Sequence, residues 1–174
     1  MKPVVYAVRA LPGGVPAEVA TRVELRGGEA RPPPRDRIHA EGREAEVLVV
    51  TYLDRVDDAL LAGLPTVRQV SSYGVGVNHV DLPAMARRGI VVTNTPDVVT
   101  DATADLAMAL LLAAARRVCE GDRLIRAGGW REAGPEFLLG REVSGKTLGI
   151  VGFGRIGQAV ARRAAGFGMR ILYA

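Results

Sequence analysis

The fold is decided by residues 147–157, which read TLGIVGFGRIG. An apolar run leads into three glycines with the spacing Gly-x-Gly-x-x-Gly, and a helix-like segment follows. Here Gly152 permits a tight strand-to-helix turn, Gly154 lets a pyrophosphate approach the backbone, and Gly157 lets helix and strand pack closely. The helix N-terminus then faces the phosphates, where Arg155 adds charge. The motif predicts a dinucleotide site for NAD or NADP, and a tight turn without a ligand is the alternative.

The choice between the two cofactors stays open. An acidic residue about 20 positions beyond such a turn usually binds the ribose 2′-hydroxyl in NAD sites. That position falls just past the strand expected over 169–174, where the sequence ends.

Short apolar runs alternate with helix-like or turn-like stretches through the first hundred residues. The run Val47-Leu48-Val49-Val50 is typical of a strand buried on both faces of a parallel sheet. Residues 27–34 form a Gly/Pro-rich loop. We expect strands over 3–8, 21–25, 46–52, 67–71 and 90–93, and short helices over 54–61 and 81–88. This alternation predicts a parallel α/β sheet with crossover helices.

A long helix is expected to follow, with Thr100 as its N-cap and Asp101 in its first turn. Residues 102–117 are apolar nearly all round, which is typical of a helix buried between domains or subunits. Further helices are expected over 120–126 and 156–167, strands over 146–151 and 169–174, and irregular structure over 130–141. We divide the chain into a first domain (1–98), a long helix and arm (99–141) and an incomplete nucleotide-binding domain (142–174).

The composition is that of a globular protein, with 48% apolar and 24% charged residues. The longest apolar run, 106–115, is half the length needed to cross a bilayer, and no signal segment opens the chain. The net charge of +4 comes from scattered arginines without a basic stripe. The single cysteine, Cys119, excludes an internal disulfide and a multi-cysteine metal site. We therefore expect a cytoplasmic protein that binds neither nucleic acid, membrane nor metal.

Four motifs follow one another along the chain. They are residues 71–81 (SSYGVGVNHVD), 95–107 (TPDVVTDATADLA), 128–130 (GGW) and 145–157 (GKTLGIVGFGRIG). In order and spacing they resemble the D-isomer-specific 2-hydroxyacid dehydrogenases, most closely the glyoxylate/hydroxypyruvate reductase branch. The resemblance implies a flavodoxin-like substrate domain followed by a Rossmann domain, which is truncated at the C-terminus in this chain.

The resemblance also implies a substrate site in the loop Tyr73, Gly74, Val75 and Gly76. In the family this loop lies at the cleft, and the backbone amides of Val75 and Gly76 hold the substrate carboxylate. Short Gly-flanked loops can aim several N–H groups at one anion. The residues alone favour a plain turn that ends a strand.

Further roles follow from the resemblance. Thr103 matches a cofactor-contacting position, although by itself it is simply part of a first helical turn. Arg155 and Ile156 match residues that meet the pyrophosphate and ribose, next to Gly152, Gly154 and Gly157. The helices over 100–126 resemble the arm through which family members dimerise, which implies a homodimer.

The family's catalytic Arg, His and carboxylate lie later in its chain than residue 174. Neither His39 nor His79 matches them, and we expect His79 to make a local polar contact. The implied reaction is hydride transfer from the nicotinamide to the carbonyl of a small 2-oxo acid such as glyoxylate or hydroxypyruvate, with the His donating the proton. We therefore assign no catalytic residue here and expect the chain to be inactive alone.

Three functions stay open for the 174 residues. The first is the N-terminal part of an NAD(P)-dependent oxidoreductase that makes D-2-hydroxy acids. The second is a non-catalytic NAD(H)-binding interaction module, since the family also contains transcriptional corepressors. The third is a dimerisation remnant that binds nothing. Titration with cofactor separates the second function from the third.

Overall fold

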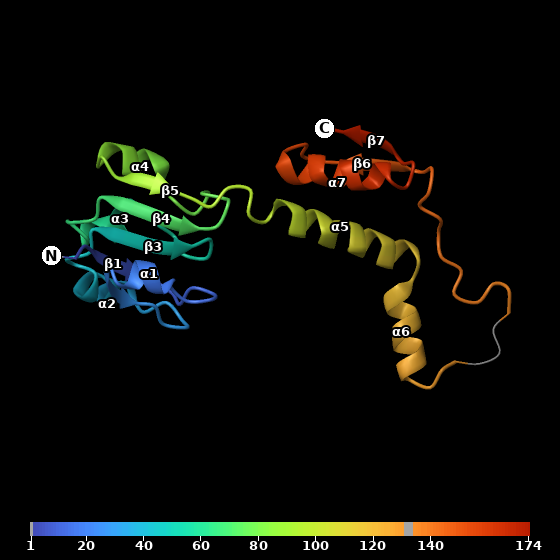
Figure 1. The fold of residues 1–174 in the computed structure, drawn as a ribbon, viewed down its shortest axis with the longest axis horizontal. Coiled ribbons are helices and arrows are strands. Elements are labelled where there is room, and N and C mark those ends of the chain that lie inside the picture. The colour runs from blue at the N-terminus through green and yellow to red at the C-terminus, as the bar shows by residue number, and fades with distance from the viewer. Residues whose placement is uncertain (1, 131–133) are drawn as a thin grey trace. The chain divides into compact units, whose positions relative to one another are not determined.

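A computed structural model describes residues 2–130 and 134–174. The chain divides into two compact units, Met1–Pro96 and Asp97–Ala174 (Figure 1). The first unit carries a five-stranded parallel sheet in the order β2-β1-β3-β4-β5, and the second carries a two-stranded parallel sheet, β6-β7. The expected parallel α/β class is confirmed. The functional division at residues 98 and 141 stays a prediction.

The first unit alternates strands and short helices. Its elements are β1 (Val4–Ala7), α1 (Ala17–Ala20), β2 (Glu24–Gly27), α2 (Arg35–Glu41), β3 (Val47–Thr51), α3 (Asp58–Ala62), β4 (Gln69–Tyr73), α4 (Leu82–Arg87) and β5 (Val91–Thr93). Because crossovers between parallel strands are right-handed, this strand order puts α2, α3 and α4 on one face of the sheet and α1 on the other.

The core of the first unit lies between the sheet and α2, α3 and α4. Tyr6, Leu48, Val50 and Val70 belong to this cluster and are completely buried. Burying one such aliphatic side chain contributes about 1.5–3 kcal/mol. Val49, which alternates with the buried residues of β3, is only half-buried because α1 is a single helical turn. This packing holds β3 and β4 in place, and the loops that follow them emerge at one edge.

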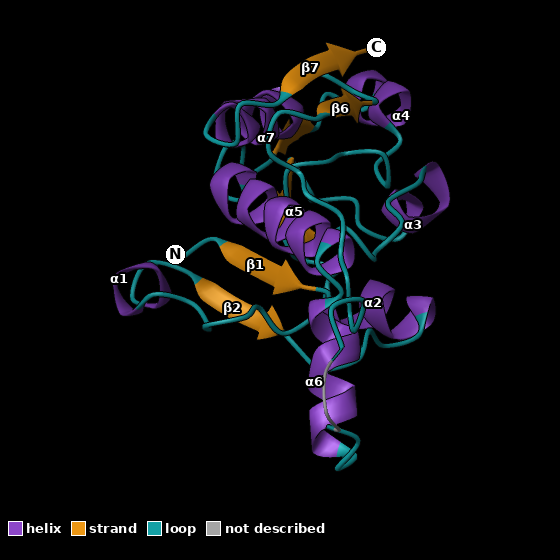
Figure 2. Cartoon of the chain, turned by 90° about the vertical axis from the view of Figure 1, so that its right-hand side faces the viewer, coloured by secondary structure: helices purple, strands orange, loops and turns teal. Residues whose placement is uncertain are grey.

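The second unit is built on helix packing. It contains α5 (Thr100–Ala115), α6 (Val118–Arg126), β6 (Thr147–Ile150), α7 (Arg155–Ala165) and β7 (Arg170–Tyr173). Helices α5 and α7 lie side by side (Figure 2). Arg163 of α7 pairs with Asp101 at 3.1 Å and with Asp105 at 2.6 Å on α5. These partly exposed ion pairs add to the packing of α7 against the long helix.

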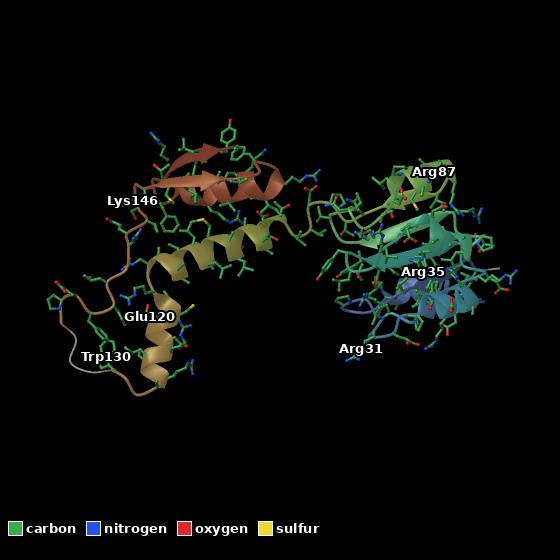
Figure 3. The ribbon with its side chains drawn as sticks, turned by 180° about the vertical axis from the view of Figure 1, so that it is seen from behind. Arg31, Arg35, Arg87, Glu120, Trp130 and Lys146 are labelled. Carbon is green, nitrogen blue, oxygen red and sulfur yellow. The ribbon has the colours of Figure 1, made fainter. Side chains whose placement is uncertain are left out.

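A sharp corner separates α5 from α6. Arg117 stands at the corner in the left-handed conformation, with φ 56°, and its guanidinium pairs with Glu120. Trp130, beyond the end of α6, packs edge-on against Phe137 with ring centroids 5.7 Å apart (Figure 3). Residues 131–133, within the segment expected to be irregular, lie outside the described residues.

The early elements differ from expectation at β2, at α3, and at α1 and α2, neither of which was expected. The expected strand over 21–25 is wrong in position, because Thr21 and Arg22 still donate N–H bonds into α1 and β2 starts at Glu24. The helix expected from residue 54 begins at 58, because the Asp54 carboxylate accepts bonds from the N–H and hydroxyl of Thr51 and closes a turn. Helix α2 lies in an Arg-rich segment for which no helix was expected.

The predictions for α5 need one correction, and its expected burial between domains or subunits stays a prediction. Thr100 is its first helical residue, not its cap, and a backbone bond from Thr100 N–H to Asp97 O at 3.1 Å leads into the helix. The helix is not buried on most faces within this chain. Only Ala104 and Met108 of α5 are buried, whereas Leu106 and Leu110 are 59% and 61% exposed. Among the described residues, no helix has the length and hydropathy of a membrane span.

Candidate functional site

The loop after β4 lies at the carboxyl edge of the five-stranded sheet. In parallel α/β sheets, ligands bind at this edge because the loops that follow the strands meet there. Tyr73 is the last residue of β4, so the predicted site begins on a strand and the loop proper starts at Gly74. A Cβ atom built on Gly76 would meet nothing within 4 Å, so this backbone is open to approach.

Two hydrogen bonds from the segment after β5 orient this loop. The backbone N–H of Thr95 donates to the carbonyl of Gly74 at 3.0 Å. The side-chain Nδ2 of Asn94 donates to the carbonyl of Val75 at 2.8 Å. All described peptide bonds are trans, so each N–H points opposite to the carbonyl of its own peptide unit. The N–H groups of Val75 and Gly76 are therefore both directed away from residues 94–95.

These two N–H groups are free. Within residues 2–130 and 134–174, neither Val75 N–H nor Gly76 N–H has a hydrogen-bond acceptor. Val75 is half-buried and Gly76 is exposed, so both donors are accessible from outside, and a ligand on that side of the loop can accept from both. Their geometry suits a small anion such as a carboxylate.

The base of the loop is tied to β4 by His79. Its Nε2 lies 3.1 Å from the hydroxyl of Ser72, which is 1% exposed. The His79 carbonyl accepts from Val56 N–H, and Asp81 N–H donates to Val56 O, both at 2.9 Å. The expectation that His79 makes a local polar contact is confirmed. A cavity of about 410 Å³, lined in part by Arg55 and Asn78, lies between the loops after β3 and β4.

The glycine turn in the second unit has the geometry that its motif predicts. Gly152 has φ 89°, a conformation that side-chain-bearing residues rarely adopt. A Cβ atom on Gly157 would lie 2.3 Å from the carbonyl oxygen of Gly152, so helix and turn are in direct contact. A Cβ atom on Gly154 would meet nothing within 4 Å, which leaves open the place where a phosphate would approach.

No side chain caps the N-terminus of helix α7. Gly154 is its N-cap and offers no side-chain bond, and the first turn holds no acidic residue. The first N–H groups of a helix have no acceptor inside it, and together with the helix dipole they favour an anion. The turn therefore fits the pyrophosphate of a dinucleotide.

The other predicted cofactor residues have separate environments. The Nε of Arg155 lies 2.8 Å from the Asp97 carboxylate, and both side chains are mostly exposed, so the pair is a weak restraint. Ile156, in the first turn of α7, is 36% exposed. Thr103 is exposed on α5. Sequence reasoning missed one contact here. Phe153 stacks on Tyr173 of β7 with ring centroids 4.1 Å apart.

Comparison with known proteins places this geometry in a family. Residues 15–167 match the family model described as D-isomer specific 2-hydroxyacid dehydrogenase, catalytic domain. The chain belongs to the D-isomer-specific 2-hydroxyacid dehydrogenases. The family expected from the four motifs is therefore confirmed.

This chain is also similar to curated and solved proteins in sequence and fold. A glyoxylate reductase of Pyrococcus furiosus is 48% identical over 179 residues, which cover 99% of this chain and 53% of that protein. A crystal structure of a Thermus thermophilus protein superposes with a TM-score of 0.87 at 43% identity, covering 98% of this chain and 55% of the other. The chain spans about half the length of the curated relatives it matches.

Among the solved structures that match, one is described with a cofactor and a small dicarboxylate bound. It is an NADPH-dependent glyoxylate/hydroxypyruvate reductase from Sinorhizobium meliloti, in complex with NADP and malonate. It is 31% identical, with a TM-score of 0.83, and the match covers 99% of this chain and 53% of that one.

Proposed function

We propose that this chain supplies the substrate-carboxylate loop and the first part of the NAD(P)-binding domain of a reductase of small 2-oxo acids. The observation that carries the proposal is the pair of free N–H groups at Val75 and Gly76, whose carbonyls are held from the opposite side. The uncapped glycine turn before α7 supports it, and so do relatives named glyoxylate reductase at 48% identity.

The loop after β4 and the glycine turn before α7 bind different molecules, the substrate and the cofactor. Val75 N–H and Gly76 N–H donate to the carboxylate of the 2-oxo acid, and hydrogen bonds to a charged acceptor are stronger than neutral ones. Gly152, Gly154 and Gly157 give the pyrophosphate access to the free N–H groups at the start of α7. The other proposed cofactor contacts are Thr103, Arg155 and Ile156.

When bound, the nicotinamide cofactor would supply the hydride, and the product is the corresponding 2-hydroxy acid: D-glycerate from hydroxypyruvate, or glycolate, which has no stereocentre, from glyoxylate. The resemblance places the Arg that polarises the carbonyl and the His that donates the proton beyond residue 174. The cofactor is NAD or NADP: the glycine turn fits the pyrophosphate that both share, and the Sinorhizobium meliloti relative was solved with NADP.

We also propose a homodimer formed through the helices over 100–126. The exposed apolar side chains on this arm support it: Leu106, Leu110, Val118 and Ile125. Large exposed apolar patches typically mark interaction sites. The expected cytoplasmic location stays a prediction, which cell fractionation would test.

Activity is tested in a chimera of residues 1–174 with the C-terminal half of the Pyrococcus furiosus relative. We expect glyoxylate-dependent oxidation of NADH or NADPH, with one hydroxy acid formed per cofactor oxidised. The 174-residue chain alone is expected to show no turnover. A folded chimera that binds cofactor but reduces neither glyoxylate nor hydroxypyruvate, while the parent enzyme does, would contradict the proposal and favour a non-catalytic module.

A further inference from the structure

We propose that Asn94 is a positioning residue, which orients the Gly76 N–H for the substrate carboxylate. This inference rests on the proposed function of the 74–76 loop. Asn94 itself does not touch the substrate. It acts through the peptide unit that joins Val75 to Gly76.

The place of Asn94 follows from the sheet register. Strands β4 and β5 pair at Val70 with Val92 and at Ser71 with Thr93, and the ladder then ends. β4 continues to Tyr73, which pairs on its other side with Thr51 of β3. Past the end of the ladder, the loop after β4 and the segment after β5 run on together without strand pairing.

Two bonds replace the ladder, and they hold different peptide units. The Thr95 N–H bond holds the unit between Gly74 and Val75. The Asn94 side-chain bond, at 2.8 Å, holds the unit between Val75 and Gly76. Among the described residues, no other donor reaches the Val75 carbonyl. Asn94 alone therefore fixes the direction of the Gly76 N–H.

A restraint is needed at this peptide because Gly76 follows it. Glycine has no Cβ atom, so a peptide unit next to it can rotate with little steric penalty. If the peptide unit between Val75 and Gly76 flipped, the Val75 carbonyl would replace the Gly76 N–H on the ligand side. A carbonyl dipole there would repel a carboxylate.

Asparagine suits this role because its amide carries N–H donors on a short side chain. Asn94 is exposed, so burial does not require it. No sequence pattern indicates the role, because Asn94 stands between the end of a strand and Pro96 and resembles an ordinary turn residue.

The test compares the 174-residue chain with Asn94→Ala and Asn94→Ser. The serine variant keeps a polar side chain that is too short to make this bond. The matched control is Asn78→Ala, because Asn78 is an exposed asparagine in the same loop region whose side chain has no hydrogen bond among the described residues. A ligand-free measurement comes first. Residual dipolar couplings of the Gly76 amide are expected to change in both Asn94 variants and to stay the same in Asn78→Ala.

The second measurement is a titration with oxamate, an unreactive analogue of a 2-oxo acid, followed by amide chemical shifts. The unaltered chain is expected to show saturable shifts at Val75 and Gly76. Loss of one net hydrogen bond of about 1 kcal/mol corresponds to roughly a five-fold rise in Kd. We expect that rise in both Asn94 variants and less than about a two-fold change in Asn78→Ala.

The two claims fail in different ways. If oxamate shifts neither Val75 nor Gly76 in the unaltered chain, the proposed function of the loop fails, and the dipolar couplings still decide the role of Asn94. An unchanged Gly76 N–H orientation in both Asn94 variants overturns the inference. An unchanged Kd for oxamate in both Asn94 variants also overturns it, provided that their other amide shifts show that they are folded.

Discussion

At Gly157 the backbone leaves no space for a side chain. A Cβ atom there would lie 2.3 Å from the Gly152 carbonyl oxygen, a backbone atom, so either the turn or α7 would have to shift. We expect Gly157→Ala to lower the free energy of unfolding by about 1–3 kcal/mol, as overpacking does, and to abolish NADH binding. Urea unfolding and an NADH titration measure the two effects.

The control for this substitution is Gly149→Ala in β6. A Cβ atom on Gly149 would meet nothing within 4 Å. Its effect is expected to stay within about 0.5 kcal/mol. Equal effects of the two substitutions would mean that the close contact at Gly157 is unimportant.

Tyr6 predicts how stability depends on alkaline pH. Its burial, and then its hydrogen bond to the Glu41 carboxylate, raise the pKa of the Tyr6 phenol from 10.0 to about 12. The folded state thus holds the proton more tightly than the unfolded chain. This contribution to stability is complete below about pH 10 and is lost as the pH rises towards about 12.

Tyr6→Phe is expected to remove this pH dependence. Urea unfolding at about pH 8 and about pH 11 should show a smaller loss of stability in the variant than in the parent chain. Tyr52→Phe is the control, because Tyr52 is 69% exposed. The assignment fails if Tyr52→Phe changes the alkaline loss as much as Tyr6→Phe does.

Single residues also show the limits of sequence reasoning. Gly152, Gly154 and Gly157 were predictable because backbone geometry demands glycine at a fixed spacing. The Asn94 bond to Val75 spans 19 positions of the chain, and the Phe153–Tyr173 stack joins a turn to a strand. Such contacts exist only once the sheet register is set, so no local pattern signals them. The predicted roles of the site residues stay proposals.

At the scale of elements, apolar runs predicted the strands well. β3 is a continuous apolar or β-branched segment, and both β3 and β4 lie within about two residues of their expected ranges. Helices α1 and α2 are short and lack apolar periodicity. Tertiary contacts define them, such as the packing of Ile38 into the core, and a local pattern does not.

Helix α5 carries the prediction about assembly. Leu106 and Leu110 lie one helical turn apart, and both are largely exposed. If the helices over 100–126 form the homodimer, Leu106→Asp combined with Leu110→Asp should yield a monomer. Sedimentation velocity measures this. Val98→Asp, at a residue that is 71% exposed and outside the helix, should stay dimeric.

Sedimentation of the unaltered chain also tests the arm. A monomer at every concentration would contradict the proposed dimer. A dimer that persists in the double variant would place the interface elsewhere on the chain.

At the scale of the whole molecule, the two units differ in how much core they contain. The main apolar core cluster consists of residues between Tyr6 and Ile90 and lies within the first unit. In the described part of the second unit, the buried apolar residues are Ala104, Met108, Ala159 and Ala164. Small domains with little buried area are marginally stable.

We therefore expect residues 1–96 alone to unfold in a cooperative transition with urea. Residues 97–174 alone should show no cooperative unfolding transition with urea. Circular dichroism of the two fragments measures this difference. A cooperative transition of the 97–174 fragment at the same midpoint as the 1–96 fragment would contradict this expectation.

The most direct test of the central claim is a titration of the isotope-labelled 174-residue chain with NADH, followed by amide chemical shifts. We predict saturable shifts at residues 152–157, which Gly157→Ala removes. Saturable shifts confined to other residues would contradict the claim, as would no shift at the highest soluble NADH concentration.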